Sequence, residues 1–568
     1  MFIREIEIKN FRGINLHVTD LKSDFLVIGK NDSGKSNLCY AIRKVIEYEV
    51  RKTPLSESDS SNSNREVIEI CLVFDLIGLT PSNRTRLGTL IEKKNGIETL
   101  TVHFRGTYSE ATQFYDEEIY FGTVDLSKTY ATNKSNPLDY VLDLIYVHPN
   151  YNFERDKNQF FKKRELRDLE DKEGISEEIR ESIQSLNNHI SSDSTIIKIR
   201  DEINGQVGFD SIFEDIKFNI SSNINTSKLY RSLDIFPLSI DGKELNNIGD
   251  GKTKTLSMLL QKMTYESDRQ KILIVEEPEN HLYPLLQQYY ATLLSSFGMD
   301  QIMYTTHSPF IINLQKMKQI IRLAQQKDAT NNKTTICHTL NVNSDDYKKF
   351  GFLQNHEIAE MFFYDKVLLI EGLSEKYFYD ALSIYDKDFQ KYLTDTRMGI
   401  FCVMGVDFAP AKELLQKIGV KVLIKTDNDI FKVPHIDRKR YAGLERTIGC
   451  INEDSKNQIC SILGVDKINK ETFRFDSSKS KDDKIEEKMK DLQEVFIKNG
   501  IFISIDHNGF EGDFLEFIGS EKIDKNDMEY LQAAKLKNLH LYVQENNIEI
   551  AISDKNKNSI LVRFMNDE

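Results

Sequence analysis

The sequence predicts an α/β protein of two domains, the first of which contains a helical insertion. A glycine-rich phosphate loop lies near the amino terminus, between an apolar strand and an amphipathic helix. After residue 346 a second set of apolar strands follows, and two of these strands end in closely spaced carboxylates. The length of 568 residues is also greater than one typical domain requires.

The composition is that of an ordinary globular chain, with 40% hydrophobic and 29% charged residues. No run of about 18 uncharged apolar residues occurs, so no transmembrane helix is expected. The charged amino terminus is typical of a strand rather than of a signal peptide. Six cysteines lack CxxC spacing, which indicates a reducing compartment and no zinc site. We therefore expect a cytoplasmic protein.

The net charge of −14, from 75 basic and 89 acidic residues, argues by itself against a simple nucleic-acid binder. However, a metal-dependent nuclease gathers carboxylates at its site, and phosphate contacts need only a local basic surface. The charge therefore leaves a nuclease possible.

The phosphate loop, residues 29–36, fits the pattern GxxxxGK[ST] in the strand–loop–helix context that the motif requires. Its main-chain N–H groups and the helix amino terminus attract phosphate. Lys35 would reach the β- and γ-phosphates of ATP, and Ser36 would hold Mg²⁺. The residues expected to bind the nucleotide here are Gly29, Asn31, Ser33, Gly34, Lys35 and Ser36.

The next segments predict a loop and two strands. Residues 51–66 are polar and low in complexity, so we expect a surface loop. Alternating apolar residues at 67–76 and 98–105 predict strands.

Residues 151–230 are rich in charge and carry apolar residues at three- and four-residue intervals, which predicts an amphipathic helix. This helical insertion could be a dimerisation element or could pack on its own domain. It divides the first domain into parts at 1–150 and 231–345. The second domain occupies 346–568.

A second motif supports the nucleotide site. The apolar strand KILIV (271–275) ends in two glutamates. Glu276 takes the position that faces the Mg²⁺ of ATP, and Glu277 takes that of a general base. His307 follows the apolar segment QIMYT, and its spacing after the glutamates favours a γ-phosphate sensor over a structural histidine.

The second domain carries the other set of acidic residues. The apolar strand at 366–370 is followed by Glu371 and Glu375, and the strand at 421–425 by Asp427 and Asp429. If the strands are neighbours, their carboxyl ends meet and the four carboxylates converge. Mg²⁺ or Mn²⁺ is the natural partner of such a set, whereas the alternative is a solvated acidic turn.

Several segments of the first domain resemble the ABC ATPase superfamily, in the branch of RecF, SMC-type and OLD (overcoming lysogenisation defect) proteins. These are IKNFRGI (8–14), EEPENHLYP (276–284) and THSP (306–309). Gly249–Lys252 stands where the family's signature loop is expected but departs from LSGGQ. The resemblance implies a head-to-tail ATPase dimer. Glu276 stands where an aspartate is usual, which leaves the rate of ATP hydrolysis open.

The pattern EGxSE…DxD resembles the Toprim domain of topoisomerases, primases and OLD nucleases. The resemblance implies that acidic residues near 506–513 bind a second metal ion, and that two ions together clamp the scissile phosphodiester. It also implies a lysine near the scissile phosphate, for which Lys535 is the match and Lys537 the competitor. The further catalytic residues implied in this way are Asp506, Glu511, Asp513 and Lys535, with Glu511 and Asp513 as metal ligands.

The order and spacing of the motifs along nearly the whole chain resemble class 2 OLD nucleases. This resemblance implies a DNA endonuclease of anti-phage defence that cuts double-stranded DNA with two Mg²⁺ or Mn²⁺ ions. It further implies a homotetramer, a UvrD-like helicase partner, and nucleotide binding that restrains cleavage.

Two alternatives compete with this interpretation. The first is a RecF- or SMC-like DNA-binding ATPase of DNA repair whose Toprim domain is inactive, but all the expected acidic positions are filled. The second is a topoisomerase or primase, which would need a tyrosine-bearing cleavage domain or a zinc module. Neither is evident in the sequence.

Overall fold

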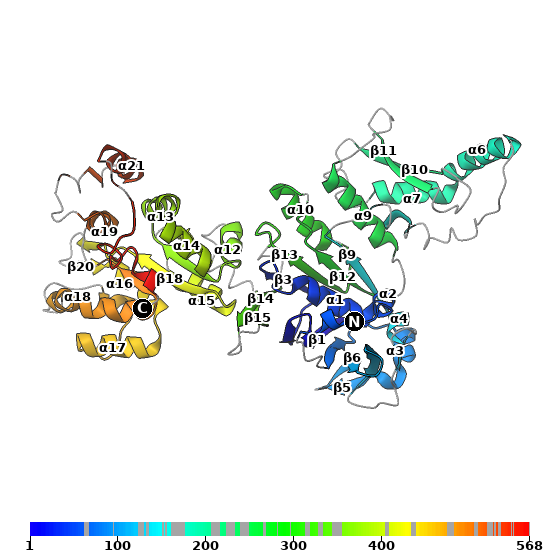
Figure 1. The fold of residues 1–568 in the computed structure, drawn as a ribbon, viewed down its shortest axis with the longest axis horizontal. Helices are drawn as coiled ribbons and strands as arrows, with labels where there is room; N and C mark the ends of the chain where they lie inside the picture. The colour runs from blue at the N-terminus through cyan, green and yellow to red at the C-terminus, as the bar shows by residue number, and fades with distance from the viewer. Residues whose placement is uncertain are drawn as a thin grey trace. The chain divides into compact units, whose positions relative to one another are not determined.

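The chain folds into two compact units, residues 1–343 and 344–568 (Figure 1). The structure is a computed structural model. It describes residues 1–61, 67–94, 96–122, 130–131, 136–149, 153, 156–158, 160, 177–205, 216–222, 233–238, 249–264, 269–280, 282–295, 297–312, 318–327, 333–342, 355–403, 408–432, 439–473, 482–504, 509–519, 526, 530–531, 535–546, 548 and 550–566.

An antiparallel sheet forms the first layer of unit 1, in the order β2-β1-β4-β6-β7-β8, with β5 beside β6. Alternating apolar side chains along these strands point into a shared core, which explains why the residues form strands. The expected strands at 67–76 and 98–105 are confirmed as β4 and β6. The strands are β1 (Phe2–Phe11), β2 (Ile14–Val18), β4 (Ile68–Asp75), β5 (Glu92–Lys94), β6 (Ile97–Ser109), β7 (Phe114–Phe121) and β8 (Tyr130–Ala131).

A second sheet of unit 1 has the order β15-β14-β3-β13-β12-β9, in which only β15 is antiparallel to its neighbour. The carboxyl ends of β3, β13 and β12 therefore share one edge of the sheet. The strands are β3 (Asp24–Gly29), β9 (Leu142–Val147), β12 (Gln270–Glu276), β13 (Gln301–Thr306), β14 (Gln319–Lys327) and β15 (Lys333–Asn341). The helices α1 (Lys35–Ile46), α9 (Asp250–Thr264) and α10 (Pro284–Ser295) belong to the same unit.

Most residues that the structure describes at 51–61 are exposed, as expected of a surface loop, but Arg51, Leu55 and Asp59 are buried. Arg51 is fully buried and donates two hydrogen bonds of 2.6 Å to Asp139, and buried Asp59 pairs with Arg12 at 2.6 Å. Ion pairs hold this polar segment against the body of the unit. The short helices of this region are α2 (Tyr48–Arg51), η1 (Glu57–Asp59), α3 (Pro81–Leu87), η2 (Gly88–Leu90) and α4 (Leu138–Val141).

The segment expected to be a helical insertion contains α6 (Glu177–Ser191) and α7 (Ser194–Asn204), but also a β-hairpin of β10 (Lys217–Ser222) and β11 (Leu233–Leu238). The Asn204 side chain exchanges two hydrogen bonds of 2.9 Å with the main chain of Phe218. The helices therefore pack on their own hairpin. A role in dimerisation stays a prediction.

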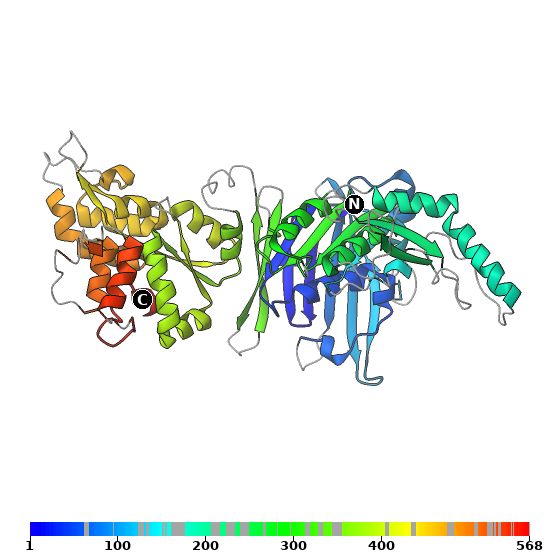
Figure 2. The ribbon, with the colours of Figure 1, turned by 90° about the horizontal axis from the view of Figure 1, so that it is seen from above.

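Unit 2 is built on a parallel sheet with the order β17-β16-β18-β21. Figure 2 shows strands of this unit with helices beside them. Its strands are β16 (Lys366–Ile370), β17 (Met398–Cys402), β18 (Lys421–Thr426) and β21 (Ile501–Ile503), and a separate pair is β19 (Ile430–Lys432) and β20 (Lys439–Tyr441). Its helices are α12 (Asn355–Met361), α13 (Leu373–Tyr385), α14 (Lys387–Thr396), α15 (Phe408–Lys417), α16 (Ala442–Thr447), η6 (Ile448–Cys450), α17 (Glu453–Leu463), η7 (Lys470–Phe473), α18 (Asp482–Ile497), α19 (Gly509–Phe517), α21 (Lys535–Glu545) and η8 (Arg563–Asn566).

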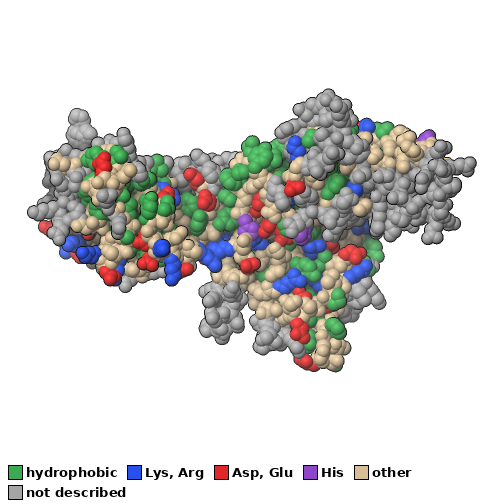
Figure 3. All heavy atoms as spheres, turned by 45° about the horizontal axis from the view of Figure 1, so that its top comes forward, with side chains coloured by type: hydrophobic (Ala, Val, Ile, Leu, Met, Phe, Trp, Pro, Cys, Tyr) green, Lys and Arg blue, Asp and Glu red, His purple; other side chains and the backbone are tan. Residues whose placement is uncertain are grey.

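Charges of both signs are interspersed on the face shown in Figure 3. Among the side chains described on that face, Lys and Arg lie between Asp and Glu rather than in one continuous stripe. In the ranges given above, no helix is both long and apolar enough to cross a membrane.

The Gln301 side chain joins the two sheets of unit 1. It is completely buried, its Oε1 accepts from the Ile3 N–H at 2.8 Å, and its Nε2 donates to the carbonyls of Ile3 (2.8 Å) and Lys22 (3.0 Å). One amide thus satisfies three main-chain groups of β1 and of the turn before β3.

We expect Gln301→Ala to lower the free energy of unfolding of unit 1 by about 2–5 kcal/mol, because it leaves buried main-chain groups without partners. Urea unfolding followed by far-ultraviolet circular dichroism measures the change. The matched control is Gln288→Ala on the exposed face of α10, which should change stability by less than about 0.5 kcal/mol. Equal midpoints for the two variants would contradict the role of Gln301.

Candidate functional site

The phosphate loop closes around a buried hydroxyl that has no partner. β3 ends at Gly29, and α1 begins at Lys35 after Gly34. A Cβ at Gly29 would lie 2.5 Å from the Ser33 Oγ and 2.6 Å from the carbonyl oxygen of Leu323, so only glycine fits. The Ser33 Oγ is buried and makes no hydrogen bond. A polar atom of this kind, within a loop of main-chain N–H groups, suits a phosphate oxygen.

Lys35 is folded back onto the loop. Its ammonium donates to the carbonyls of Gly29 (3.0 Å) and Lys30 (2.8 Å). Burial lowers the pKa of Lys35 to about 8, although Glu277 and other nearby carboxylates oppose the shift. Asn31 and Ser36 are exposed at the loop surface. The lysine and both exposed residues are therefore available to a nucleotide.

Glu276, at the end of β12, is buried and accepts a hydrogen bond of 2.5 Å from the Tyr146 hydroxyl. The guanidinium of Arg43 lies 3.7 Å from the centre of the Tyr146 ring. Burial and the Glu276 carboxylate both raise the pKa of Tyr146, so the hydroxyl stays a donor. The carboxylate expected to face Mg²⁺ is therefore hydrogen-bonded to a tyrosine that no sequence motif singled out.

The structure brings Glu277 and His307 together as the sequence predicts. The Glu277 Oε1 lies 3.1 Å from the His307 Nε2, and the Glu277 Oε2 accepts from the Asn280 amide at 3.1 Å. Burial lowers the pKa of His307, and nearby Lys35 lowers it further. A neutral imidazole can then share a proton with Glu277 or with a γ-phosphate.

Glu279 is a functional candidate that the sequence motifs did not single out. Its Oε1 accepts from the Thr306 hydroxyl (2.7 Å) and from the His307 N–H (2.6 Å). This carboxylate fixes the main chain that carries the histidine. The sequence signal that could have identified Glu279 is its place as the third acid of EEPE (276–279). A carboxylate so close to two others needs hydrogen-bond donors of its own.

In unit 2, Glu371 lies directly after β16 and reaches the end of neighbouring β18. Its Oε2 accepts from the Thr426 hydroxyl at 2.8 Å and faces the Asp427 N–H at 3.4 Å. Its Oε1 forms an ion pair with Arg446 on α16. Arg446 also pairs with Asp429 at 3.4 Å. One arginine thus links the two predicted carboxylate motifs.

Glu375 lies in the first turn of α13 and is buried. Its Oε2 accepts from the N–H groups of Glu371 (2.9 Å) and Gly372 (3.1 Å), which caps the helix. Burial raises the pKa of Glu375 to about 8, with Lys425 opposing. This residue therefore both caps a helix and faces the carboxylate cluster.

Lys425 is the centre of that cluster, and its side chain is completely buried. The ammonium lies 3.0 Å from Asp513, 3.4 Å from Asp427 and 3.5 Å from Glu375. It also donates to the Ser504 hydroxyl at 2.9 Å. Burial alone would lower the pKa of Lys425, but the three carboxylates raise it well above its usual value. The lysine therefore stays charged.

The region after β21 joins the cluster through α19. Asp513 is buried and accepts from the Ser504 hydroxyl at 2.5 Å, and Glu511 is buried on the same helix. Gly509 has a φ of +62°, and a Cβ there would lie 2.9 Å from the Asp427 Oδ2, so glycine admits the aspartate. Asp506 lies outside the described residues. Lys535 begins α21, but its side chain lies outside them as well.

The donor set suits a hard divalent cation, because it consists of carboxylate and hydroxyl oxygens. Burial raises the pKa of Glu371, and the nearby Asp427 carboxylate raises it further, although the Arg446 guanidinium opposes the shift. Within the described part of the chain, however, no three Asp, Glu, His or Cys side chains lie where they could hold one ion. Lys425 and Arg446 stand between the carboxylates. These two basic residues supply positive charge among the carboxylates, and the predicted Mg²⁺ or Mn²⁺ site stays a prediction.

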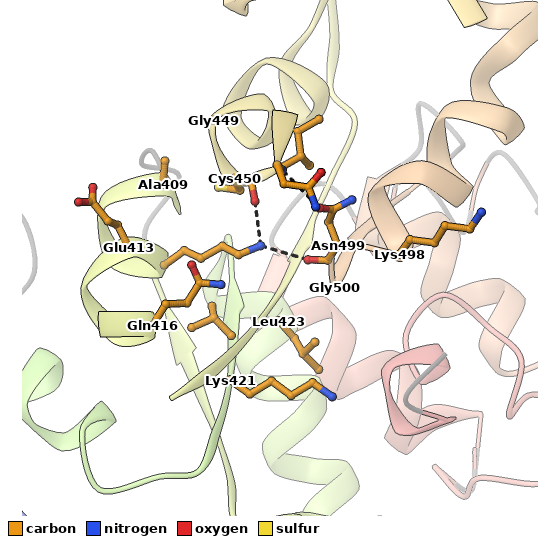
Figure 4. Close-up of a pocket in the computed structure, with 14 residues that line it drawn as sticks. Ala409, Glu413, Gln416, Lys421, Leu423, Gly449, Cys450, Lys498, Asn499 and Gly500 are labelled. Carbon is orange, nitrogen blue, oxygen red and sulfur yellow. Dashed lines mark hydrogen bonds between the residues drawn. The ribbon is translucent and has the colours of Figure 1, made fainter. Parts of the chain in front are cut away.

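A cavity of about 560 Å³ lies at the opposite, amino-terminal ends of β18 and β21 (Figure 4). The Lys412 ammonium is buried there and donates to the carbonyls of Cys450 (2.8 Å) and Asn499 (3.1 Å). These bonds tie α15 to η6 and to the turn before β21. We assign the cavity no part in the chemistry.

Comparison with known proteins agrees with these motifs. Residues 1–357 match the family described as "Protein of unknown function (DUF2813)". Residues 362–429 match "Overcoming lysogenization defect protein-like, TOPRIM domain". The expected fold class, an ABC-type ATPase domain followed by a Toprim domain, is confirmed by this match and by the two strand orders.

Two curated proteins named "Endonuclease GajA" are similar to this chain. The protein from Bacillus cereus (strain VD045) is 26% identical over 585 residues, which cover 95% of this chain and 94% of that protein. The protein from Bacillus cereus (strain HuB5-5) is 24% identical over 222 residues, or 33% and 31% of the two chains. The segments TDNDI (426–430) and YLQAAKL (530–536) predict a likeness to GajA in particular, and this resemblance to an OLD-family nuclease is confirmed.

Solved structures of SMC heads are similar to part of this chain. "Crystal structure of the SmcHead bound to the C-winged helix domain of ScpA" is 15% identical with a TM-score of 0.39, and the match covers 61% of this chain and 99% of that one. "SMC head domain from Thermotoga maritima" is 12% identical with a TM-score of 0.32, covering 60% and 100%.

We expect Lys425→Met to lower the free energy of unfolding of unit 2 by about 3–5 kcal/mol, because buried Glu375 and Asp513 and half-buried Asp427 lose their cation. Thermal unfolding of the full-length chain measures the loss. Lys421→Met is the matched control, since Lys421 begins the same strand and its side chain is exposed. Equal losses in the two variants would mean that Lys425 does not hold the cluster.

Proposed function

The chain belongs to the family described as "Protein of unknown function (DUF2813)", and we propose that it is a metal-dependent DNA endonuclease controlled by nucleotide binding. The observation that carries the proposal is the arrangement at the carboxyl ends of adjacent parallel strands, where Glu371 faces the Asp427 N–H and shares Arg446 with Asp429. The similarity of nearly the whole chain to proteins named endonuclease supports it.

In the proposed mechanism, Glu371, Asp427 and Asp429 would hold one divalent cation once Arg446 has released Glu371 and Asp429, and Glu511 and Asp513 would contribute to a second. Such ions, Mg²⁺ or Mn²⁺, lower the pKa of bound water and offset charge on the phosphodiester. Arg446 now neutralises Glu371 and Asp429, so it must release them before they can act as ligands. Lys425 keeps Asp427 and Asp513 in place from the buried side. Lys535 would stabilise the negative charge that develops on the phosphate.

The nucleotide site is proposed as a control rather than a motor. Lys35 and Ser36 would bind the phosphates and Mg²⁺ of ATP, and Glu276 would complete the Mg²⁺ site. The Tyr146 hydroxyl occupies one Glu276 oxygen, so the tyrosine must move before that oxygen can contact an ion or its water shell. This requirement favours slow turnover and a conformational response to nucleotide binding.

The proposed setting is anti-phage defence in the cytoplasm, as part of a Gabija-type system. The substrate would be double-stranded DNA, and the working form a homotetramer of ATPase and nuclease dimers. A UvrD-like helicase of the GajB type would be the partner subunit. These assignments rest on the similarity to GajA.

A RecF- or SMC-like DNA-binding ATPase with an inactive Toprim domain is the second candidate. The favouring observation is that Lys425 and Arg446 already neutralise the carboxylate cluster. This candidate binds DNA but does not cleave it with any divalent ion.

We expect Glu371→Gln to reduce plasmid cleavage in Mg²⁺ or Mn²⁺ at least about 100-fold, because a metal ligand and its charge are lost. Gel electrophoresis of nicked and linear products measures the rate. The control is Glu413→Gln, on the exposed side of α15, where the Glu413 carboxylate pairs with Lys417 at 2.7 Å. Cleavage by Glu371→Gln at the rate of the parent would refute the site. DNA binding without cleavage by the parent would establish the second candidate.

The proposed control of cleavage by nucleotide binding has a separate test. We expect ATP to inhibit cleavage by the parent and to have no effect on Lys35→Ala, because that variant loses its phosphate contact. Cleavage is measured across an ATP series at constant free Mg²⁺. If cleavage by the parent requires ATP, the nucleotide activates the nuclease and the proposed inhibition is wrong.

A further inference from the structure

Lys254 is a completely buried lysine in the first turns of α9, and no motif singled it out. Its ammonium donates to the carbonyl of Glu277 at 3.0 Å and to that of Asn280 at 3.4 Å. Both carbonyls belong to the turn that follows β12. The contact therefore joins a helix to the turn that carries the proposed general base.

The Glu277 main chain needs external support. Its φ of +47° lies in the left-handed region, which is unfavourable for a residue with a Cβ. The Glu277 N–H donates to the Thr305 carbonyl at 3.0 Å on β13, while its own carbonyl accepts from Lys254. The peptide is thus held from the sheet on one side and from α9 on the other.

Helix α9 connects Lys254 to the segment 249–252 at its amino terminus. Gly249 accepts from the Lys252 N–H at 2.9 Å, so the segment 249–252 is continuous with the first turn of α9. Lys254 follows within the same helix. A displacement of the segment therefore moves the lysine, and a completely buried ammonium cannot readily exchange its carbonyl partners for bulk solvent.

We propose that Lys254 is a positioning residue that ties the segment 249–252 to Glu277, so that contacts made on this segment set the position of the general base. The inference rests on the nucleotide site proposed above. It gives that site a route by which a surface contact controls hydrolysis without touching the nucleotide.

The test uses the full-length chain and separates binding from hydrolysis. Lys254→Met keeps the aliphatic stem and removes the donor, whereas Lys254→Arg keeps charge and donors. Lys271→Met, at the start of β12, is the matched control.

Affinity is measured with a fluorescent ATP analogue, hydrolysis as single-turnover phosphate release, and folding by thermal unfolding. We expect Lys254→Met to slow hydrolysis about tenfold or more, with nucleotide affinity changed less than about threefold. Lys254→Arg should recover part of the rate.

A double-mutant cycle tests the link itself. Asp250→Ala alters the segment, and its effect on hydrolysis should be lost in the Lys254→Met background. Independent, additive effects would overturn the link, as would hydrolysis by Lys254→Met at the parental rate.

Two further outcomes separate this inference from the proposed function. A parent that binds ATP without hydrolysing it overturns the role of Lys254 and leaves nucleotide control intact. A parent that binds no nucleotide overturns both. Parallel losses of affinity, rate and melting temperature in Lys254→Met, without rescue by arginine, would reduce Lys254 to a structural residue.

Discussion

The ion contacts of Lys425 determine how unit 2 can be built. A buried ammonium and buried carboxylates are each costly alone, and together they are tolerable only in a fixed arrangement. Asp427 follows a strand, while Glu375 and Asp513 come from two different helices. Because all three must reach one nitrogen, α13 and α19 have little freedom to shift relative to β18. The acidic cluster is consequently held in place before any ligand binds.

Unit 1 also contains a buried lysine that holds the residues after a strand, but its hydrogen-bond acceptors differ. Lys254 donates to main-chain carbonyls rather than to carboxylates, so it orients a peptide without neutralising an acid. The acids nearby make their contacts elsewhere, Glu276 with Tyr146 and Glu277 with His307. In both units a buried lysine holds the residues that follow a strand. Lys425 pairs with carboxylates and so offsets part of the negative charge that would attract a metal ion. Lys254 binds neutral carbonyls and offsets no carboxylate charge by these contacts.

Much of the candidate site could be predicted because strand ends and short motifs are local features. The pairs Glu277–His307 and Glu371–Asp427 follow from parallel strands that end at one edge. The lysine in KVLIK could not be distinguished from an ordinary strand flank, because only the fold shows which acids surround it. Arg446 and Tyr146 were missed for the same reason. The β10–β11 hairpin was missed since its short strands carry weak apolar alternation.

The Gln301 contact has a consequence for how the chain assembles during synthesis. Its amide binds Ile3, a residue made 298 positions earlier. At ~5–20 residues per second the ribosome needs roughly 15–60 s to cover that distance. Throughout this interval β1 can pair with β2 and β4 but not with its later partner. The antiparallel sheet can therefore form first, whereas the mainly parallel sheet that contains β13 closes only after most of unit 1 has been synthesised.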